Sequence, residues 1–212
     1  MRLKRMMNGM EIRDFSGDGE TEVKGLAYDS RAVEPGFMFV ALRGQTFDGH
    51  DFIGKAVENG AIAVVAEKFN RTDQGIATVL VRDSRVALSK LSVRFFDRPF
   101  KDIGLTGITG TNGKTTTSYL LESILLAAGA KPGVIGTINY RFCGETLEAP
   151  VTTPESLDLM RTLREMADAG VTHVVMEVSS HALDQGRARD CPFKIVVFTN
   201  ISRDHLDYHQ SM

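Results

Sequence analysis

The strongest chemical signal in the sequence is the stretch 107–117, Gly-Ile-Thr-Gly-Thr-Asn-Gly-Lys-Thr-Thr-Thr. Glycines allow a tight turn that aims backbone N–H groups inward, a lysine neutralises phosphate oxygens, and a threonine hydroxyl reaches Mg²⁺. The spacing departs from the common phosphate-loop form, which would need a glycine where this chain has Ile108. We therefore predict a shorter variant of that loop, with ATP as its ligand. The predicted nucleotide-binding residues are Gly110, Thr111, Asn112, Gly113, Lys114, Thr115 and Thr116.

A carboxylate and a histidine are the best candidates for holding a metal ion beside this loop. Glu177 closes an apolar run that reads as a strand, and a carboxylate at a strand end near a phosphate loop is well placed for Mg²⁺. The alternative is a strand-end glutamate that faces solvent. The polar segment 200–209 follows another apolar run, and we expect His205 to reach the same metal, with Asp207 and His209 as scaffold. The predicted metal ligands are Thr115, Glu177 and His205.

Two further polar strips have chemical potential. Thr152-Thr153-Pro154 precedes a helical pattern, with Thr153 as a plausible N-cap and Pro154 at the first helical position. Capping and ligand binding both stay open for this strip. Farther along, Arg187 offers a planar fork suited to carboxylate or phosphate. In the first hundred residues, 29–31 and 44–50 are rich in turn-forming residues, and physics alone assigns them no more than that.

The elements that would position these residues predict an α/β fold in two parts. A boundary is expected at Asp97-Arg98-Pro99, where proline stops a helix. This separates a small N-terminal α/β domain (1–98) from the first part of a P-loop-type parallel-sheet ATPase domain (99–212). The expected strands are 23–28, 37–42, 61–66, 78–81, 103–109, 134–138, 173–178 and 195–200, and the expected helices are 51–59, 84–96, 115–128 and 154–169. Ligands in such sheets collect beyond the carboxyl ends of the strands, where Gly110, Asn139, 177–180 and 200–204 are expected.

Composition narrows the class of protein. A formal net charge of −2 over 212 residues gives no electrostatic reason to expect a nucleic acid partner. The basic start is followed by no apolar region, so we expect neither a signal peptide nor a membrane span. The two cysteines, Cys143 and Cys191, lack metal-ligand spacing and fit a reducing compartment, so a cytoplasmic location is expected.

Taken together, the motifs resemble the Mur ligase family over nearly the whole chain. The matching segments are "DSRAVEPGFMFVALRGQTFDGHDFI", "GITGTNGKTTT", "GTINY", "APVTTPESLDLM", "MEVSSHALDQGR" and "FTNISRDHLDYH". The resemblance implies an N-terminal domain that holds uridine diphosphate, a central ATPase domain, and a C-terminal domain that receives an amino acid. It implies ATP-dependent addition of the third amino acid, diaminopimelate or lysine, to UDP-N-acetylmuramoyl-L-alanyl-D-glutamate through an acyl phosphate.

The resemblance also assigns roles to residues of this chain. It implies catalytic or charge-neutralising roles for Lys114, Glu177 and His205. It implies contacts to the UDP end from Tyr28, Ser30, Gln45, Thr46 and Phe47, although this last triplet differs from the His-Gln-Ala form found in the family. It implies contacts to the sugar, pyrophosphate and dipeptide from Thr152, Thr153, Ser179, Gln185 and Arg187.

Where the sequence stops bears on activity. The resemblance implies a carbamylated lysine shortly after the segment that matches "DHLDYH", and a whole amino-acid-binding domain, and neither lies within residues 1–212. We therefore expect the 212 residues alone to form no amide bond. Two other readings stay open: a P-loop kinase or NTPase, and a nucleotide-sugar- and ATP-binding module that does not turn over.

Overall fold

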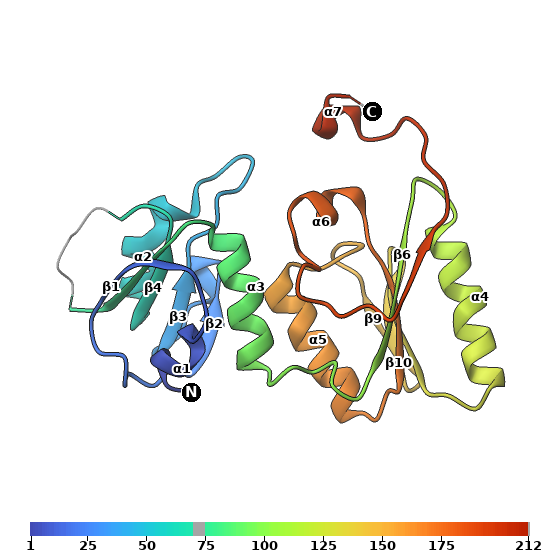
Figure 1. Cartoon of the computed structure of the whole chain (residues 1–212), viewed down its shortest axis with the longest axis horizontal. Coiled ribbons are helices and arrows are strands. Elements are labelled where there is room, and N and C mark those ends of the chain that lie inside the picture. Colours follow the sequence, from blue (N-terminus) through green and yellow to red (C-terminus); the bar gives the residue numbers. More distant parts are fainter. Residues whose placement is uncertain (70–74, 212) are drawn as a thin grey trace. The chain divides into compact units, whose positions relative to one another are not determined.

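The computed structural model describes residues 1–69 and 75–211, and within them the chain forms two compact units, Met1–Asp97 and Arg98–Met212. Each unit contains one sheet (Figure 1). In the part of the chain that the structure describes, no helix is both long enough and apolar enough to cross a membrane.

The first unit is a five-stranded sheet in the order β1-β5-β4-β3-β2. Strands β2 to β5 run parallel, whereas β1 pairs antiparallel with β5. Their bounds are Ile12–Ser16 (β1), Gly25–Ala27 (β2), Phe37–Val40 (β3), Ala63–Ala66 (β4) and Ala77–Val81 (β5). Sequence patterns predicted the four parallel strands and missed β1, because its side chains are largely exposed and form no apolar run.

The described part of the first unit also contains the α-helices α1 (Leu3–Met7), α2 (Ile53–Glu58) and α3 (Ser84–Phe95) and two short 3-10 helices, Ser30–Ala32 and Gly49–Phe52. The start of α3 is set by Asp83, whose carboxylate accepts hydrogen bonds from the backbone N–H groups of Arg85 and Val86. One face of this helix buries Leu88 and Leu91 completely, and each such burial contributes roughly 1.5–3 kcal/mol. The helix ends just before Asp97 and Arg98, which both have positive φ, at the boundary that Pro99 predicted.

The second unit is a six-stranded sheet in the order β11-β6-β10-β7-β8-β9. Its strands are Gly104–Thr109 (β6), Pro132–Ile135 (β7), Asn139–Phe142 (β8), Glu145–Glu148 (β9), His173–Glu177 (β10) and Ile195–Phe198 (β11). The first four in the spatial order are parallel, as their near-continuous apolar runs predicted. The carboxyl ends of β11, β6, β10 and β7 therefore meet along one edge.

The hairpin β8–β9 was not predicted, and it corrects the expected four-strand sheet and the expected place of Asn139. Asn139 begins β8 rather than ending a parallel strand, and its side chain accepts a hydrogen bond from Arg141. The two strands are joined by Cys143 and Gly144, with φ of +51° and +84°. Positive φ at both central residues is typical of a type I′ turn, which is usually signalled by Asn-Gly rather than Cys-Gly.

Helices α4 (Lys114–Ala127) and α5 (Ser156–Asp168) lie on opposite faces of this sheet (Figure 1). Two shorter helices, α6 (Ser180–Asp184) and α7 (Leu206–His209), follow β10 and β11. Helix α5 buries Leu159, Leu163 and Met166 completely, at the spacing of one helical face. Helix α4 covers Ile108, Val134 and Val175 with Leu121 and Leu125.

The start of α5 differs from the predicted start. The helix begins at Ser156, and its N-cap is Glu155, whose carboxylate accepts from the N–H of Ser156 at 3.0 Å. Thr153 is not the N-cap and Pro154 is not the first helical residue. The hydroxyl of Thr153 instead donates to the carbonyl of Glu177, at the end of β10, so it does not cap the helix. A long-range contact thus overrode a local preference.

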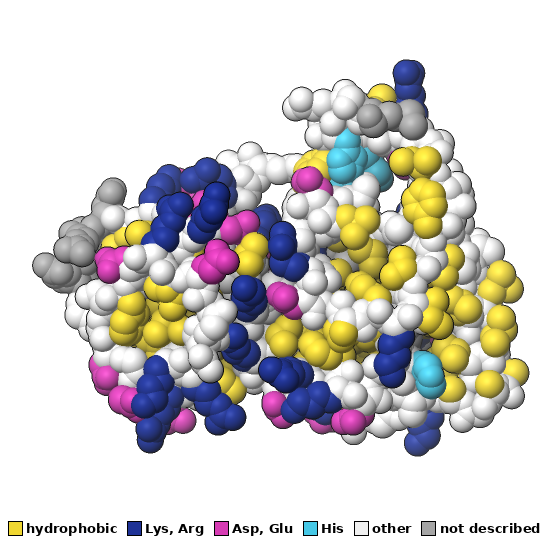
Figure 2. All heavy atoms as spheres, in the orientation of Figure 1, with side chains coloured by type: hydrophobic (Ala, Val, Ile, Leu, Met, Phe, Trp, Pro, Cys, Tyr) yellow, Lys and Arg dark blue, Asp and Glu magenta, His cyan; other side chains and the backbone are white. Residues whose placement is uncertain are grey.

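The outward side of α4 exposes apolar side chains. Leu120, Ile124 and Leu126 are each about 60 % exposed, at 61 %, 62 % and 58 %. Figure 2 shows hydrophobic side chains along the edge of the molecule that α4 forms. Only the inner side of α4 packs against the sheet, through Leu121 and Leu125.

Candidate functional site

The loop between β6 and α4 has the backbone shape of a phosphate-binding loop. Gly110 and Gly113 adopt φ of +131° and +85°, which side chains rarely allow, and α4 begins at Lys114. A Cβ on Gly110 would lie 2.2 Å from the hydroxyl oxygen of Thr199. The first N–H groups of α4 have no intrahelical acceptor, and with the helix dipole they favour an anion at this point.

The end of β11 holds this loop in place. The carbonyl of Asn200 accepts from the N–H of Thr111 at 2.9 Å, and its side-chain oxygen accepts from the N–H of Asn112 at 3.1 Å. The carbonyl of Asn112 accepts from the Asn200 amide at 3.0 Å and from the Thr199 hydroxyl at 2.7 Å. Sequence reasoning placed Asn200 near the loop but not its role as an anchor, which depends on β11 lying beside β6.

Lys114 folds over the loop that precedes it. Its ammonium donates to the carbonyls of Gly110 and Thr111 at 2.6 and 3.1 Å. The positive charge is thereby held at the centre of the turn, where it can neutralise phosphate oxygens.

Glu177, at the end of β10, is a buried carboxylate surrounded by donors. It is 1 % exposed, so the solvent-facing alternative is wrong. Hydroxyls of Thr115 and Thr137 donate to Oε2, both at 2.9 Å, and the hydroxyl of Ser118, which donates to the carbonyl of Thr115 at 2.8 Å, lies 3.4 Å from Oε1. Thr115 and Glu177, two of the three predicted metal ligands, are therefore in direct contact. Thr137 and Ser118 were not predicted. The position of Thr137, two residues after the end of β7, was the available signal.

The polar strip 152–153 lies beside the same carboxylate, but its two threonines differ. Thr153 is buried; its hydroxyl donates to the carbonyl of Glu177 at 2.9 Å and accepts from the N–H of Ser179 at 3.0 Å. Thr152 is half-buried, and its hydroxyl lies 3.1 Å from that of Thr137. Thr153 is therefore occupied in bonding the backbone at and just after the end of β10, and Thr152 is the more accessible of the pair.

Arg187 and Gln185 form a unit after α6. The Nε and Nη2 of Arg187 donate to Gln185 Oε1 at 3.0 and 2.7 Å, and its Nη1 donates to the carbonyl of Thr153 at 2.9 Å. Glu155 lies 3.9 Å from the same guanidinium. The side chain of Ser179 caps α6 by accepting from the N–H of Ala182. The structure thus brings all five residues predicted to grip the sugar and dipeptide into the second unit.

His205 lies in a cluster of rings rather than against Glu177. Its ring centroid is 4.7 Å from that of His181, which also contacts Tyr208 and His209 at 4.1 and 5.4 Å. Burial first, and then the neighbouring imidazoles, lower the pKa of His181. No hydrogen bond or ion pair joins His205 to Glu177 among the described residues, and no group of three His, Cys, Asp or Glu there is arranged to hold a metal. The metal role of His205 stays a prediction.

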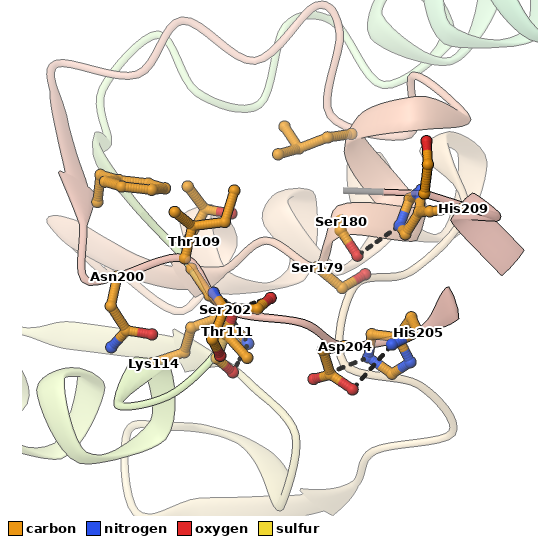
Figure 3. Close-up of a pocket in the computed structure, with 15 residues that line it drawn as sticks. Thr109, Thr111, Lys114, Ser179, Ser180, Asn200, Ser202, Asp204, His205 and His209 are labelled. Carbon is orange, nitrogen blue, oxygen red and sulfur yellow. Dashed lines mark hydrogen bonds and ion pairs between the residues drawn. The ribbon is translucent and has the colours of Figure 1, made fainter. Parts of the chain in front are cut away.

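The phosphate loop, the start of α6 and the segment after β11 line a cavity of about 400 Å³, whereas Glu177, Thr152 and Arg187 do not line it. Figure 3 shows Lys114, Thr111 and Asn200 on one side of it, and His209, bonded to Ser180 at 2.9 Å, on the other. The Asp204–His205 pair lies along the same cavity. A phosphate-binding loop, a lysine and two strand ends thus open onto one hollow.

The residues predicted to contact UDP lie in the first unit, after β2 and β3. These strands are adjacent and parallel, so the segments that follow them share one edge of the sheet. Tyr28 is half-buried and Ser30 buried, and the carbonyl of Ser30 accepts from the Asn59 side chain at 2.8 Å. Gln45, Thr46 and Phe47 are exposed in a turn, with the ring of Phe47 70 % exposed.

A cluster of charges follows that exposed turn. Asp48 lies 2.9 Å from the ammonium of Lys68 and 2.5 Å from Nδ1 of His50, and His50 Nε2 accepts from the N–H of Glu67 at 3.0 Å. His50 therefore donates from Nδ1 to Asp48. Lys68 first, and then the N–H of His50, hold the pKa of the Asp48 carboxyl well below its usual range. The cluster fixes the base of the turn and leaves residues 45–47 exposed.

Comparison with known families decides the assignment of this site. The model of the Mur ligase middle domain matches residues 108–212, and the model described as Mur ligase family, catalytic domain, matches residues 22–95. The chain belongs to the Mur ligase family. The phosphate loop and Glu177 lie in the middle domain, and the predicted UDP contacts lie in the other matched region.

Relatives and solved structures resemble the whole chain. It is 48 % identical over 212 residues to the UDP-N-acetylmuramoyl-L-alanyl-D-glutamate--2,6-diaminopimelate ligase of Geobacter metallireducens, covering 100 % of this chain and 42 % of that one. The ligase of the same name from Bacillus licheniformis is 43 % identical over 213 residues, with 100 % and 43 % covered. A solved structure of a ligase of that name has a TM-score of 0.82 and 30 % identity, and covers 100 % of this chain and 42 % of its own. The chain thus spans less than half the length of these Mur ligases.

Proposed function

We propose that the protein containing this chain is an ATP-dependent amide ligase that joins diaminopimelate to UDP-N-acetylmuramoyl-L-alanyl-D-glutamate. The carrying observation is the contact between the phosphate loop and the buried carboxylate: Thr115, at the start of α4, donates to Glu177 at the end of the adjacent strand. The names of relatives 48 % and 43 % identical to the chain support the substrate pair and favour diaminopimelate over lysine.

The donor set around Glu177 suits a magnesium ion. Mg²⁺ prefers hard oxygen ligands and is usually bound by one or two carboxylates together with the phosphates of a nucleotide. Thr115 and Glu177 would hold it here. When bound, the ion would neutralise charge on the phosphate oxygens of ATP. His205 completes the set in our proposal, as the side chain that would approach from the β11 side of the cavity.

The proposed reaction proceeds in two transfers. The γ-carboxylate of the D-glutamate residue attacks the γ-phosphorus of ATP, which gives an acyl phosphate and ADP. The amine of diaminopimelate then attacks the carbonyl carbon, the C–O bond to phosphate breaks, and the products are an amide, inorganic phosphate and a proton. Lys114 would neutralise charge on the transferring group, and positioning of the reactants provides much of the acceleration.

In this proposal, each unit contacts a different part of the UDP-linked substrate. Tyr28, Ser30 and residues 45–47 would hold the uridine diphosphate end. Thr152, together with the Arg187–Gln185 unit, would hold the sugar and dipeptide near the phosphate loop. A cytoplasmic location is proposed with this function, because ATP and UDP-linked substrates are cytosolic metabolites.

The 212 residues by themselves fit a narrower role. Because they span 42 % of the relative from Geobacter metallireducens, we propose that they bind ATP and the UDP-linked substrate without forming the amide. The narrower role and the ligase proposal are compatible, since one concerns the 212 residues and the other the protein that contains them.

The test is an amide-formation assay of the intact enzyme with ATP, Mg²⁺, the UDP-linked dipeptide and diaminopimelate. We expect one ADP and one phosphate for each amide formed, and no ADP release when the UDP-linked dipeptide is omitted. The 212-residue chain is the matched control and is expected to form no amide. ATP hydrolysis by the intact enzyme that proceeds equally well without either substrate would point to the NTPase reading instead.

A further inference from the structure

Thr137 binds the buried carboxylate of Glu177 through both its backbone and its side chain. Its N–H donates to Oε1 at 3.4 Å, and its hydroxyl donates to Oε2 at 2.9 Å. Because the two bonds reach different oxygens, together they oppose rotation of the carboxylate. The hydroxyl of Thr115 approaches Oε2 from the phosphate loop. Glu177 is thus held from two sides, by the loop after β6 and by the segment after β7.

The backbone before Thr137 is shaped for this close approach. A Cβ on Gly136 would lie 2.5 Å from Oε1 of Glu177, closer than any side chain permits. Glycine is therefore required where β7 ends if the next residue is to reach the carboxylate with both donors.

Thr152, Thr137 and Glu177 form a short chain of hydrogen bonds, here called the relay. Its direction is fixed because each threonine hydroxyl has only one hydrogen to donate. Thr137 gives its hydroxyl hydrogen to Glu177, so in its 3.1 Å contact with Thr152 it must be the acceptor. Thr152 therefore donates to Thr137, which donates to Glu177. The relay joins a residue of the proposed substrate strip to the proposed metal carboxylate through one intervening side chain.

Thr137 differs in burial from a threonine whose hydroxyl serves only to satisfy buried backbone groups. Thr153, on the same strip, is 1 % exposed, and its hydroxyl joins the carbonyl of Glu177 to the N–H of Ser179. Thr137 is exposed, and its hydroxyl would be well solvated in other rotamers. The carboxylate oxygen that Thr137 binds also accepts from the hydroxyl of Thr115 at 2.9 Å. The hydroxyl of Thr137 is therefore not needed to satisfy a buried group, and its effect is on orientation.

We propose that Thr137 is a positioning residue, which sets the orientation of the Glu177 carboxylate for a divalent cation bound with nucleotide and links that carboxylate to Thr152. The inference rests on the proposed function, because it takes Glu177 as a metal ligand. Thr137 itself touches neither reacting group in this account. Its contribution is the hydroxyl, so serine should replace it and valine should not.

The experiment measures Mn²⁺ binding to the intact enzyme in the presence of ADP, by the loss of the free-ion EPR signal. We expect Thr137→Val to weaken Mn²⁺ binding roughly tenfold, the effect of losing one hydrogen bond to a charged group. The Mn²⁺ affinity of Thr137→Ser should stay within about twofold of the wild-type affinity. Thr146→Val, on the exposed strand β9, is the matched control. ADP binding in EDTA and the urea midpoint should not change in any variant, and Thr137→Ala serves if the valine variant misfolds.

The relay adds a second readout. In a double-mutant cycle, Thr137→Val and Thr152→Val should weaken Mn²⁺ binding non-additively, because each breaks the same chain of hydroxyls. If the wild type binds Mn²⁺ and Thr137→Val binds it equally well, or if Thr137→Ser binds it as weakly as Thr137→Val, the role of Thr137 is wrong. The proposed function would stand in either case. Absence of Mn²⁺–ADP binding in the wild type would instead overturn the proposed function, and this inference with it.

Discussion

The two regions assigned to ligand binding differ in how much of their geometry the chain itself supplies. In the second unit, the phosphate loop is tied to Asn200, and Glu177 accepts bonds from hydroxyls on both sides. In the first unit, residues 45–47 form an exposed turn, and the ordered contacts lie beneath it at Asp48. The proposed nucleotide region is thus organised in advance, whereas the proposed uridine diphosphate region has an ordered base and an exposed tip.

This difference determines how strongly each region of the structure restricts the ligand that it can bind. A site with fixed backbone N–H groups and a buried carboxylate constrains its ligand strongly, because few ligands satisfy those groups. An exposed turn constrains its ligand weakly, since its side chains are already solvated. The predictions below act on one region at a time.

The largest effect is expected from removing the charge at the phosphate loop. Lys114→Ala in the intact enzyme should lower kcat on the order of 10³-fold, as expected for losing a group that stabilises the charge in phosphoryl transfer. Binding of the UDP-linked substrate should survive, because its proposed uridine contacts lie in the first unit. Steady-state kinetics and calorimetric titration check the two parts. Equal loss of both in a folded variant would show that the loop is misassigned.

A backbone change should separate loop geometry from loop charge. Gly110→Ala places a Cβ 2.2 Å from the Thr199 hydroxyl oxygen at a positive φ, and should destabilise the chain by about 2–4 kcal/mol. Gly129→Ala, also at positive φ but with nothing within 4 Å, is the control and should cost about 1 kcal/mol. Urea unfolding measures both. Equal costs would mean that contact with β11 does not shape the loop.

The smallest effect is expected in the first unit and depends on pH. The Asp48 carboxyl has its pKa lowered in the folded chain by Lys68 and the His50 N–H. Its contribution to stability is therefore present above the unfolded pKa, about 3.9, and is lost as pH falls through the folded pKa. Asp48→Asn should lower Tm at pH 7 by a few degrees, and the difference should shrink below about pH 4. A difference that does not depend on pH would exclude the charge as its cause.

How far the sequence predicted the structure varied with the range of the contacts. The phosphate loop, the strand before it and the helix after it follow from adjacent residues, and sequence patterns identified them. Glu177 was predicted from its place at a strand end, and its contact with Thr115 follows from β10 lying beside β6. The parallel order of the strands places the phosphate loop after β6 and Glu177 at the end of β10 at the same edge of the sheet.

The contacts missed were those made across the sheet. Thr137 and Asn200 each follow the end of a strand, but the partner that each one binds lies on a strand or loop far away in sequence, which no local pattern shows. The pattern at Thr153-Pro154 predicted a helix start, but the carbonyl of Glu177 binds the threonine hydroxyl instead. The β8–β9 hairpin was missed because Cys143-Gly144 is an unusual pair for its turn.

The most direct test of the central claim is a thermal titration of the 212-residue chain with Mg²⁺ and ATP, and separately with UDP-N-acetylmuramoyl-L-alanyl-D-glutamate. A ligand at a hundredfold its Kd should stabilise a folded binder by about 2.7 kcal/mol. We predict a clear shift with Mg²⁺ and ATP that Lys114→Ala removes, and a shift with the UDP-linked substrate that this variant keeps. A cooperative transition that neither ligand moves would contradict the account of a nucleotide site organised within these residues.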